Sequence, residues 1–459
     1  MPDAMNALSR RRFLSTTGRA TALAAAASPV LFHGGTSRAQ GANERIVMAL
    51  IGAGGRGGSH ATGFAKLPGV EFKSICDVWD TRANGVIRDV KKIQGRAPKR
   101  VTDMREILDD PEINAVVIAT PEHWHALATI WACQAGKDVY VEKCPSLWIW
   151  EGRQAVHAAA KHKRIVQVGF QNRSAPYANT ARDYIASGKL GRVVLVKVCN
   201  LLGGQKFVPK PDAPVPEGLD WDRWLGPAPS VPYNPGRHLG WYDWWDYKGG
   251  ALVDDGSHQL DLARHALGNP PHPRSVLCVG GNYGFRSSRQ APELQAITWD
   301  FGDFAMTCDS GNSTNHLRKS NGDERYGKKW PHWPSNAERI EIYGTDRLMY
   351  LGRHGVGWQV VETDGKVIAE DKGTHPDVWH RPNFLDCVRA RKTPNSNSEE
   401  AHRSACLVHM ANLSYRVGNR QLTLDPDTER FVEDSTAAKA ANQLLRPRNR
   451  PPYEIPEIS

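Results

Sequence analysis

An apolar segment that runs directly into a glycine-rich turn constrains this chain more than any other feature. The segment Ile46–Ile51 is followed by Gly52-Ala53-Gly54-Gly55-Arg56-Gly57. Glycines in such a turn let backbone N–H groups approach a pyrophosphate, while the next helix presents its N-terminus to the phosphate charge. The pattern predicts a dinucleotide-binding turn, with an ordinary strand–turn–helix connection as the alternative. The predicted cofactor contacts are Gly52, Gly54, Gly55, Arg56 and Gly57.

An acidic residue at the end of the next apolar run favours NAD as the dinucleotide. The run Val70–Cys76 ends in Asp77, twenty residues after Gly57. A carboxylate at this position accepts hydrogen bonds from the adenosine ribose hydroxyls and repels a 2′-phosphate. NAD is therefore expected rather than NADP, although Arg82 lies nearby and would favour the phosphate.

The N-terminal residues read as an export signal. Ser9-Arg10-Arg11-Arg12-Phe13-Leu14 matches the twin-arginine pattern, a weakly apolar stretch covers residues 21–32, and Ser37-Arg38-Ala39 is a small-residue cleavage site. The alternative is a disordered N-terminus with a chance run of arginines. We expect a signal peptide over residues 1–39, the twin-arginine export machinery as a partner, and a periplasmic or extracellular mature protein. The apolar stretch is too short for a permanent membrane span.

Export of this kind has a consequence for the cofactor. The twin-arginine route carries folded proteins, and free nicotinamide cofactor is scarce outside the cytoplasm. The cofactor is therefore expected to be tightly bound before export. The reaction should then either return NAD to its starting redox state or use a second substrate to do so.

Composition is that of a folded two-domain enzyme and excludes several other classes. The chain has 459 residues, of which 40% are hydrophobic and 24% charged, with a net charge of +10 that falls to about +6 without the leader. Outside the arginine-rich segment 446–450 there is no block of like charges, so nucleic acid binding is not expected. The eight cysteines form no CxxC pair, and folding before export favours reduced, buried thiols.

The order of apolar segments predicts two kinds of sheet. Strands and helices alternate up to about residue 166, which indicates a doubly wound parallel sheet: strands at Ala115–Thr120, Asp138–Glu142 and Ile165–Gly169, and helices at His123–Ala135 and Trp148–His162. Mixed-period strands then suggest a largely antiparallel sheet: Arg192–Asn200, Ser275–Tyr283, Ala296–Phe301, Ala305–Asp309 and Arg339–Gly344. A Pro- and Trp-rich loop is expected over Gly203–Lys248, and helices over Phe384–Ala390 and Glu399–Val417.

Several motifs, in this order, resemble the glucose–fructose oxidoreductase, inositol dehydrogenase and rhizopine-catabolism (Gfo/Idh/MocA) family. They are the glycine turn, Thr120-Pro121-Glu122-His123-Trp124-His125, Val141-Glu142-Lys143, and the segment Gly249–Asp261. The segments 151–154, 167–174 and 224–229 look most like the exported branch of the family. The resemblance implies an N-terminal Rossmann domain over residues 40–166 and, over 167–459, a C-terminal α+β domain with a large, mostly antiparallel open sheet. It covers nearly the whole mature chain and specifies the fold far better than the substrate.

By this resemblance, Lys143 lies beside the nicotinamide and the reacting carbinol. A partly desolvated ammonium next to a positive nicotinamide has a lowered pKa and can hydrogen-bond or relay a proton from the substrate hydroxyl. The other implied cofactor contacts are Thr120, Pro121, His125 and Glu142. One departure is that Cys144 stands where the family usually has proline, with Pro145 next, so the local backbone after Lys143 differs from the pattern.

Asp254 and His258 are four residues apart in an apolar, helical stretch, so their side chains should lie on one face. Histidine titrates near working pH, and a carboxylate can stabilise its imidazolium. Spacing alone favours a structural polar stripe. The family's DxxxH motif instead implies His258 as general base and Asp254 as the residue that orients it.

Substrate contacts are expected from the aromatic cluster before this helix and from two further acids. Aromatic rings stack on the C–H faces of sugars, although core packing is an equal alternative for each ring. The candidates are Trp241, Trp244, Trp245, Tyr247, Asp255 and Asp261. His123 and His125 have no third ligand at suitable spacing, so no metal is predicted.

Taken together, the sequence predicts an exported NAD-dependent oxidoreductase that acts on a sugar or polyol hydroxyl. One alternative is an NAD-dependent glycosidase of the α-N-acetylgalactosaminidase type, which oxidises C3 transiently and eliminates the leaving group. Another is a catalytically inactive protein that binds sugar or NAD. A homo-oligomer is expected.

Overall fold

The computed structural model describes residues 45–458. The predicted twin-arginine leader, residues 1–39, lies outside the described residues. No helix within residues 45–458 combines the length and the apolar character needed to cross a membrane. All eight cysteines are buried and unpaired.

The first sheet has six parallel strands in the order β3-β2-β1-β4-β5-β6, the arrangement of a dinucleotide-binding domain. Its strands are β1 (Ile46–Ile51), β2 (Val70–Cys76), β3 (Lys99–Val101), β4 (Ala115–Ile118), β5 (Asp138–Val141) and β6 (Val166–Val168). Its helices are α1 (Gly55–Ala65), α2 (Asp80–Gln94), α3 (Met104–Leu108), α4 (His125–Gln134) and α5 (Ile149–Lys161), with the 3-10 turn η2 (Glu122–Trp124) before α4. The predicted doubly wound sheet is confirmed.

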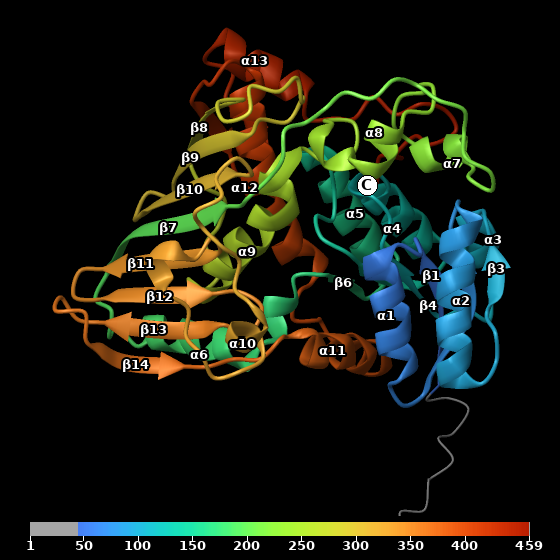
Figure 1. Cartoon of the computed structure of the whole chain (residues 1–459), viewed down its shortest axis with the longest axis horizontal. Coiled ribbons are helices and arrows are strands. Elements are labelled where there is room, and N and C mark those ends of the chain that lie inside the picture. The colour runs from blue at the N-terminus through green and yellow to red at the C-terminus, as the bar shows by residue number, and fades with distance from the viewer. Residues whose placement is uncertain (1–44, 459) are drawn as a thin grey trace, which may run out of the picture. The chain divides into compact units, whose positions relative to one another are not determined.

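Both faces of this sheet are covered because successive residues of a strand point in opposite directions. Val47, Ala49 and Ile51 of β1 pack in one cluster with residues of α3, α4 and α5. Met48 and Leu50 pack in another with residues of α1 and α2. Figure 1 shows α1 and α2 on one side of the sheet and α4 and α5 on the other.

The boundary expected at residue 166 cuts through β6, which pairs with β5 in the parallel sheet. Later parts of the chain also return to this sheet. Phe384 and Leu385 of α11 (Asp377–Ala390) pack in the α1–α2 cluster, and Tyr453 and Ile458 pack in the α4–α5 cluster. Residues from the C-terminal part of the chain therefore complete the two hydrophobic clusters that cover the parallel sheet.

The second sheet has ten strands in the order β14-β13-β12-β11-β7-β10-β9-β8-β15-β16. Every pairing in it is antiparallel except that of β7 with β10. The strands are β7 (Val193–Leu201), β8 (Ser275–Gly281), β9 (Leu294–Asp300), β10 (Ala305–Gly311), β11 (Arg339–Gly344), β12 (Leu348–Gly352), β13 (Gly357–Val361), β14 (Val367–Asp371), β15 (Leu422–Asp425) and β16 (Arg430–Phe431). The predicted mostly antiparallel sheet is confirmed.

Helices cover one face of this sheet, as Figure 1 shows for α9 and α12. They are α6 (Pro176–Ala186), α9 (Ser257–Ala266), α12 (Ser398–Arg416) and α13 (Thr436–Gln443). The opposite face exposes alternate residues of β8 and β9. The expected loop 203–248 contains the short helices α7 (Trp221–Leu225), α8 (Pro235–Leu239) and η4 (Trp241–Asp243). Other short helices of the described chain are η3 (Gln171–Ser174), the π-helical turn η5 (Leu252–Gly256), α10 (Gly322–Arg325) and η6 (Trp333–Ser335).

Candidate active site

The glycines of the first turn divide into two that serve the fold and two that leave space. Gly52 has φ +93°, and a Cβ there would lie 2.7 Å from the backbone of Ala119. A Cβ on Gly57 would lie 1.9 Å from the carbonyl oxygen of Gly52. By contrast, a Cβ on Gly54 would meet only the Arg82 guanidinium, at 3.2 Å, and one on Gly55 would meet nothing within 4 Å. The open side of the turn is therefore free for a bound phosphate group.

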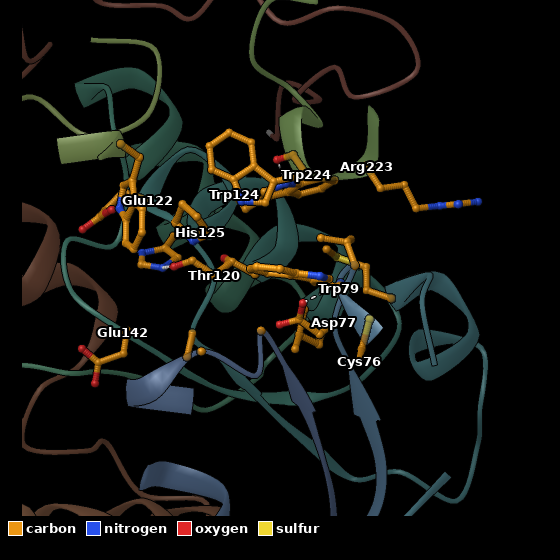
Figure 2. Close-up of a pocket in the computed structure, with 18 of the residues that line it drawn as sticks. Cys76, Asp77, Trp79, Thr120, Glu122, Trp124, His125, Glu142, Arg223 and Trp224 are labelled. Carbon is orange, nitrogen blue, oxygen red and sulfur yellow. Dashed lines mark hydrogen bonds between the residues drawn. The ribbon is translucent and has the colours of Figure 1, made fainter. Parts of the chain in front are cut away.

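This turn opens into a cleft of about 410 Å³ at the carboxyl ends of the parallel strands, where doubly wound folds bind their ligands. The cleft is lined by Gly52, Gly54, Gly55 and Arg56, by Asp77 after β2, by Thr120 and Pro121 after β4, and by Glu142 and Lys143 after β5. Trp224, Trp241, Tyr242, Lys248, Asp254 and Tyr453 from later in the chain complete it. Figure 2 shows Asp77 and Glu142 on one side of this cleft and Trp224 and Arg223 on the other.

Asp77 stands at the end of β2, as predicted, and its carboxylate is anchored by the backbone. Its oxygens accept hydrogen bonds from Ala53 N at 2.6 Å and from Trp79 N at 2.8 Å. Burial raises the pKa of this carboxyl, although the two hydrogen bonds oppose the shift. Each oxygen keeps a free lone pair, so Asp77 can still accept hydrogen bonds from a ligand in the cleft.

Glu142 and Arg56 form an ion pair beside the glycine turn. Arg56 Nε lies 2.8 Å from Glu142 Oε1, and its other nitrogens bind both carboxylate oxygens of Asp377. His60 Nε2 lies 2.6 Å from the same oxygen of Glu142. Burial alone would raise the pKa of Glu142, but Arg56 and His60 hold it well below its usual range. Both residues predicted as cofactor contacts therefore line the cleft in a fixed arrangement.

Lys143, which follows β5, contacts Asp254 in the π-helical turn η5. Its Nζ lies 2.5 Å from the Asp254 carbonyl oxygen and 3.1 Å from Asp254 Oδ1. A second lysine, Lys248, lies 2.7 Å from the same Oδ1 and 2.5 Å from Glu122 Oε1. The four groups form a continuous row of alternating charge: Glu122, Lys248, Asp254 and Lys143. Although burial opposes both shifts, these partners raise the pKa of Lys248 and lower that of Asp254, so Asp254 is an anion at neutral pH.

His125 joins the two loops that carry these groups. Its Nδ1 lies 2.6 Å from the Cys144 carbonyl oxygen and its Nε2 lies 2.8 Å from that of Thr120. Cys144 itself is fully buried, and burial raises the pKa of its thiol to about 12. The residue that replaces the usual proline is thus a packed, neutral side chain behind Lys143.

Comparison with known proteins identifies the fold and the cofactor domain. A family model described as "Oxidoreductase family, NAD-binding Rossmann fold" matches residues 46–170, and one described as "Oxidoreductase family, C-terminal alpha/beta domain" matches residues 180–279 and 351–455. The chain belongs to the Gfo/Idh/MocA oxidoreductase family.

Within this family, the similar proteins include enzymes of sugar and polyol chemistry. The chain is 28% identical to scyllo-inositol 2-dehydrogenase (NAD(+)) of Bacillus subtilis, over 76% of this chain and 88% of that enzyme. It is 29% identical to an alpha-N-acetylgalactosaminidase of Shewanella oneidensis, over 35% of this chain and 39% of the enzyme. It spans about half the length of other curated relatives that it matches. A levoglucosan dehydrogenase solved with NADH and levoglucosan shares the fold, with a TM-score of 0.61 at 18% identity, over 83% of this chain and 99% of that one.

The role of Asp254 in orienting His258, implied by the family's DxxxH motif, stays a prediction. Asp254 lies in the π-helical turn η5, and His258 lies in the helix α9 that follows it. No hydrogen bond joins the two side chains among the described contacts, since Asp254 is held by Lys143 and Lys248. His258 is 7% exposed, and burial, with Lys143 and Arg353 nearby, holds its pKa well below its usual range. Its imidazole is therefore neutral, and its Nδ1 is buried without a hydrogen-bond partner in the described structure.

Most of the predicted substrate contacts prove to be structural. Trp241 lines the cleft, but Trp244 packs under the Arg237 guanidinium, Trp245 lies against Tyr415, and Tyr247 is fully buried. Tyr247 therefore packs in the core, and the half-buried Trp244 and Trp245 do not line the cleft.

Asp261 and Asp255, the two acids predicted as substrate contacts, also differ in position. Asp261 is 1% exposed and forms an ion pair with Arg173 at 2.8 Å, so its place is also structural. Asp255 binds Lys319 and, at 2.7 Å, Arg353, and lines a neighbouring cavity.

One group in the described part of the chain has the geometry of metal ligands. Atoms of His272, Cys406 and Glu429 lie within 4.8 Å of one another. Glu429, however, already accepts hydrogen bonds from His272, His402 and, at 2.6 Å, Arg153. Because the Arg153 guanidinium balances the carboxylate charge, the group is explained as a buried hydrogen-bond network, and the absence of a metal stays a prediction.

Sequence reasoning missed Lys248 and Glu122. Lys248 has a 4% exposed side chain and directly precedes Gly249-Gly250 and the helical segment of Asp254. The available signal was a lysine at the end of an aromatic run interrupted only by Asp243 and Asp246. Glu122 was quoted only as part of a motif, and its partner lies 126 residues further along the chain.

Proposed function

We propose that this protein is an exported, NAD-dependent oxidoreductase that removes hydride from a CH–OH group of a sugar or polyol. The observation that carries the proposal is that Lys143 and Asp254, in contact with each other, line the same cleft as the glycine turn. NAD, when bound, supplies the hydride acceptor. The open faces of Gly54 and Gly55 and the free lone pairs of Asp77 fit the pyrophosphate and the ribose of this cofactor.

Lys143 is proposed to hold the oxygen of the reacting carbinol. Its ammonium is fixed by Asp254 and keeps one N–H free for the substrate, because it has three donors and two protein partners. Lys248 keeps Asp254 ionised and in place. His258, which the family's DxxxH motif implies as general base, is proposed to accept the hydroxyl proton.

Export is proposed from the leader motif, and the structure supports the accompanying idea of a retained cofactor. The segment around Leu219 crosses the cofactor domain: Asp80 N donates to the Gly218 oxygen and Asp220 N donates to the Val78 oxygen. Trp224 from this segment and Tyr453 from the C-terminal end line the cleft. A bound dinucleotide could leave only after these contacts opened.

The test is to express the full-length chain in a host with a twin-arginine pathway, purify it from the periplasm, denature it and quantify the released nicotinamide. We expect about one NAD(H) per chain, consistent with a single glycine turn. A mature protein that stays in the cytoplasm contradicts export. A periplasmic protein that contains no nicotinamide contradicts the retained cofactor.

The second candidate is redox-assisted glycoside cleavage, favoured by the similarity to the alpha-N-acetylgalactosaminidase. Transient oxidation at C3 would acidify the C2 proton and allow elimination of the leaving group. Water would then add at C1 with a proton returning to C2, and reduction of the C3 ketone would leave NAD unchanged. An aryl glycoside assay in deuterated water separates the two. Cleavage with deuterium at C2 and no accumulated NADH supports the glycosidase, whereas an oxidised sugar supports the dehydrogenase. Intact Lys143, Asp254 and His258 argue against an inactive binding protein.

A homo-oligomer is also proposed. The open face of the second sheet exposes Val194, Leu277 and Val279, and apolar residues gathered on a sheet face commonly mark an interface. Light scattering coupled to size-exclusion chromatography should give a mass above that of one chain. A monomer at micromolar concentration would contradict this.

A further inference from the structure

A second cavity adjoins the cleft on the side of the ten-stranded sheet. It has a volume of about 580 Å³ and is lined by the loop after β7, the loop after β10, and residues 242–255. Tyr242 and Asp254 line both this cavity and the cofactor cleft. A ligand group held at Lys143 is therefore only one side chain, Asp254, away from the second cavity.

The polar groups of this cavity are held in place and balanced in charge. Arg289 has a 6% exposed side chain and lies 2.9 Å from Asp243 and 2.5 Å from Asn312 Oδ1. Lys319 pairs with Asp255. A third cation, Lys206, also lines the cavity, together with the acids Asp243, Asp254 and Asp255. Three cations and three carboxylates leave the lining without a net charge to attract an anion, while they offer hydroxyl groups both donors and acceptors.

Aromatic rings complete the lining. Tyr242 is 39% exposed and stacks on Trp241 with ring centroids 4.6 Å apart. Phe207, from the loop after β7, packs edge-to-face on Trp244 at 6.0 Å. Rings supported in this way can receive the C–H face of a pyranose, while the fixed polar groups bind its hydroxyls.

We infer that the second cavity is a subsite for a further neutral sugar ring, so that the substrate is a glycoside of at least two rings with the oxidised carbinol on the ring at Lys143. The inference rests on the proposed function and specifies its substrate class. The ring at Lys143 occupies the cleft, and the glycosidic bond passes Asp254 and Tyr242, which line both spaces, into the second cavity.

The experiment compares matched monosaccharides and disaccharides, namely glucose with cellobiose and maltose, and N-acetylgalactosamine with its β-linked galactosyl disaccharide. The filling variant is Leu317→Trp, at a half-buried residue of the cavity away from Lys143. The control is Val208→Trp, at an exposed residue that lines neither cavity. We expect kcat/KM for at least one disaccharide to exceed that of its monosaccharide about tenfold, the factor given by one well-made contact. Leu317→Trp should remove this preference without changing monosaccharide turnover, and Val208→Trp should retain it.

The inference would be overturned if every disaccharide and its monosaccharide had equal kcat/KM. It would also be overturned if Leu317→Trp lowered kcat/KM equally for both. Calorimetric binding of the same sugars to the NAD-loaded protein keeps the subsite distinguishable from the proposed function. If no sugar is oxidised, tighter disaccharide binding that is lost in Leu317→Trp still supports the subsite while the proposed function fails. If binding shows no such preference, the subsite is wrong as well.

Discussion

Lys248 Nζ lies 2.7 Å from Asp254 Oδ1, and the same oxygen lies 3.1 Å from Lys143 Nζ. A single carboxylate oxygen thus joins a buried lysine to the lysine proposed to hold the substrate. On the far side, Lys248 is paired with Glu122 at 2.5 Å. Lys248 is therefore a positioning residue, which acts on the reaction through Asp254 and Lys143.

Removal of Lys248 should reduce turnover without removing NAD. Lys248→Met alone leaves Glu122 buried without its counter-charge, which typically costs about 3–5 kcal/mol. The double variant Glu122→Gln/Lys248→Met avoids this loss and should fold. Its kcat is expected to fall at least roughly tenfold, because Lys143 loses its fixed position, while its NAD content stays at the wild-type value.

The matched control for this experiment is Glu122→Gln alone. It keeps the Lys248–Asp254 contact, so its kcat should lie close to that of the wild type, and Lys248→Arg should recover part of the activity lost in the methionine variant. A double variant with wild-type kcat would show that Asp254 and Lys143 do not depend on Lys248.

Gly54→Val should lower NAD retention while leaving the fold intact. A Cβ at Gly54 would meet only the movable Arg82 side chain. The valine side chain should therefore occupy the space proposed for the pyrophosphate without disturbing the packing of the protein. The nicotinamide content of the purified variant and its urea unfolding curve measure the two effects separately. Gly85→Ala, in helix α2 and outside the cleft lining, where a Cβ would lie 4.0 Å from the Arg88 side chain, is the control for an added side chain in this domain. Undiminished NAD in Gly54→Val would remove the basis for the pyrophosphate site.

Asp77→Asn should narrow the preference for NAD over NADP. The asparagine keeps an acceptor for one of the backbone bonds from Ala53 and Trp79, but loses the negative charge that repels a 2′-phosphate. Dissociation constants for both cofactors, measured on apoprotein, are the readout. An equal loss of affinity for NAD and NADP would mean that Asp77 does not distinguish the ribose hydroxyl from the 2′-phosphate.

His380 should make the protein less stable in mild acid. Its Nε2 donates to the Val168 oxygen at 3.0 Å and its Nδ1 accepts from Ser174 Oγ at 2.7 Å, and burial lowers its pKa from 6.5 to about 4. Below pH 6.5 the imidazole becomes protonated in the unfolded chain, whereas in the folded chain it stays neutral until about pH 4. The free energy of unfolding therefore falls as the pH is lowered from 6.5 to about 4.

The variant His380→Gln removes this contribution. The drop in unfolding free energy between about pH 7.5 and about pH 5 should be smaller than in the wild type by roughly 2 kcal/mol. The control His316→Gln, at an exposed histidine, should leave the drop unchanged. A drop of wild-type size in His380→Gln would show that His380 is not the group being titrated.

The sequence predicted the parts of the site that follow from local patterns. The glycine turn, Asp77 at the end of β2, and Lys143 at the end of β5 are set by strand and turn chemistry, and each lies where it was expected. Strands β7 to β11 were found to within two residues of their ends, because each is six to nine residues long and therefore gives a recognisable pattern. Strands β12 to β16 were not predicted, since their pairing depends on neighbours in the sheet rather than on their own short sequences.

The rest of the site depends on contacts between distant parts of the chain. Four-residue spacing placed Asp254 beside His258, but Asp254 lies in a π-helical turn and its carboxylate is bound by Lys143 and Lys248. Tyr247 and Asp261 share their segment with true cleft residues, yet their side chains point into the core. Which face of a short segment points to a cleft is decided by packing and could not be inferred from spacing.

The central claim, hydride transfer from a carbinol with Lys143 at its oxygen, is tested most directly by isotope transfer. Protein loaded with NAD is incubated with mono- and disaccharides deuterated at each carbinol carbon, and deuterium on the released nicotinamide is measured in a single turnover by mass spectrometry. For at least one sugar, wild-type protein should transfer deuterium, and Lys143→Met and His258→Ala should each do so at least roughly a hundredfold more slowly with NAD still bound. Transfer at the wild-type rate in Lys143→Met, or NAD-loaded wild-type protein that transfers deuterium from none of these sugars, would contradict the account.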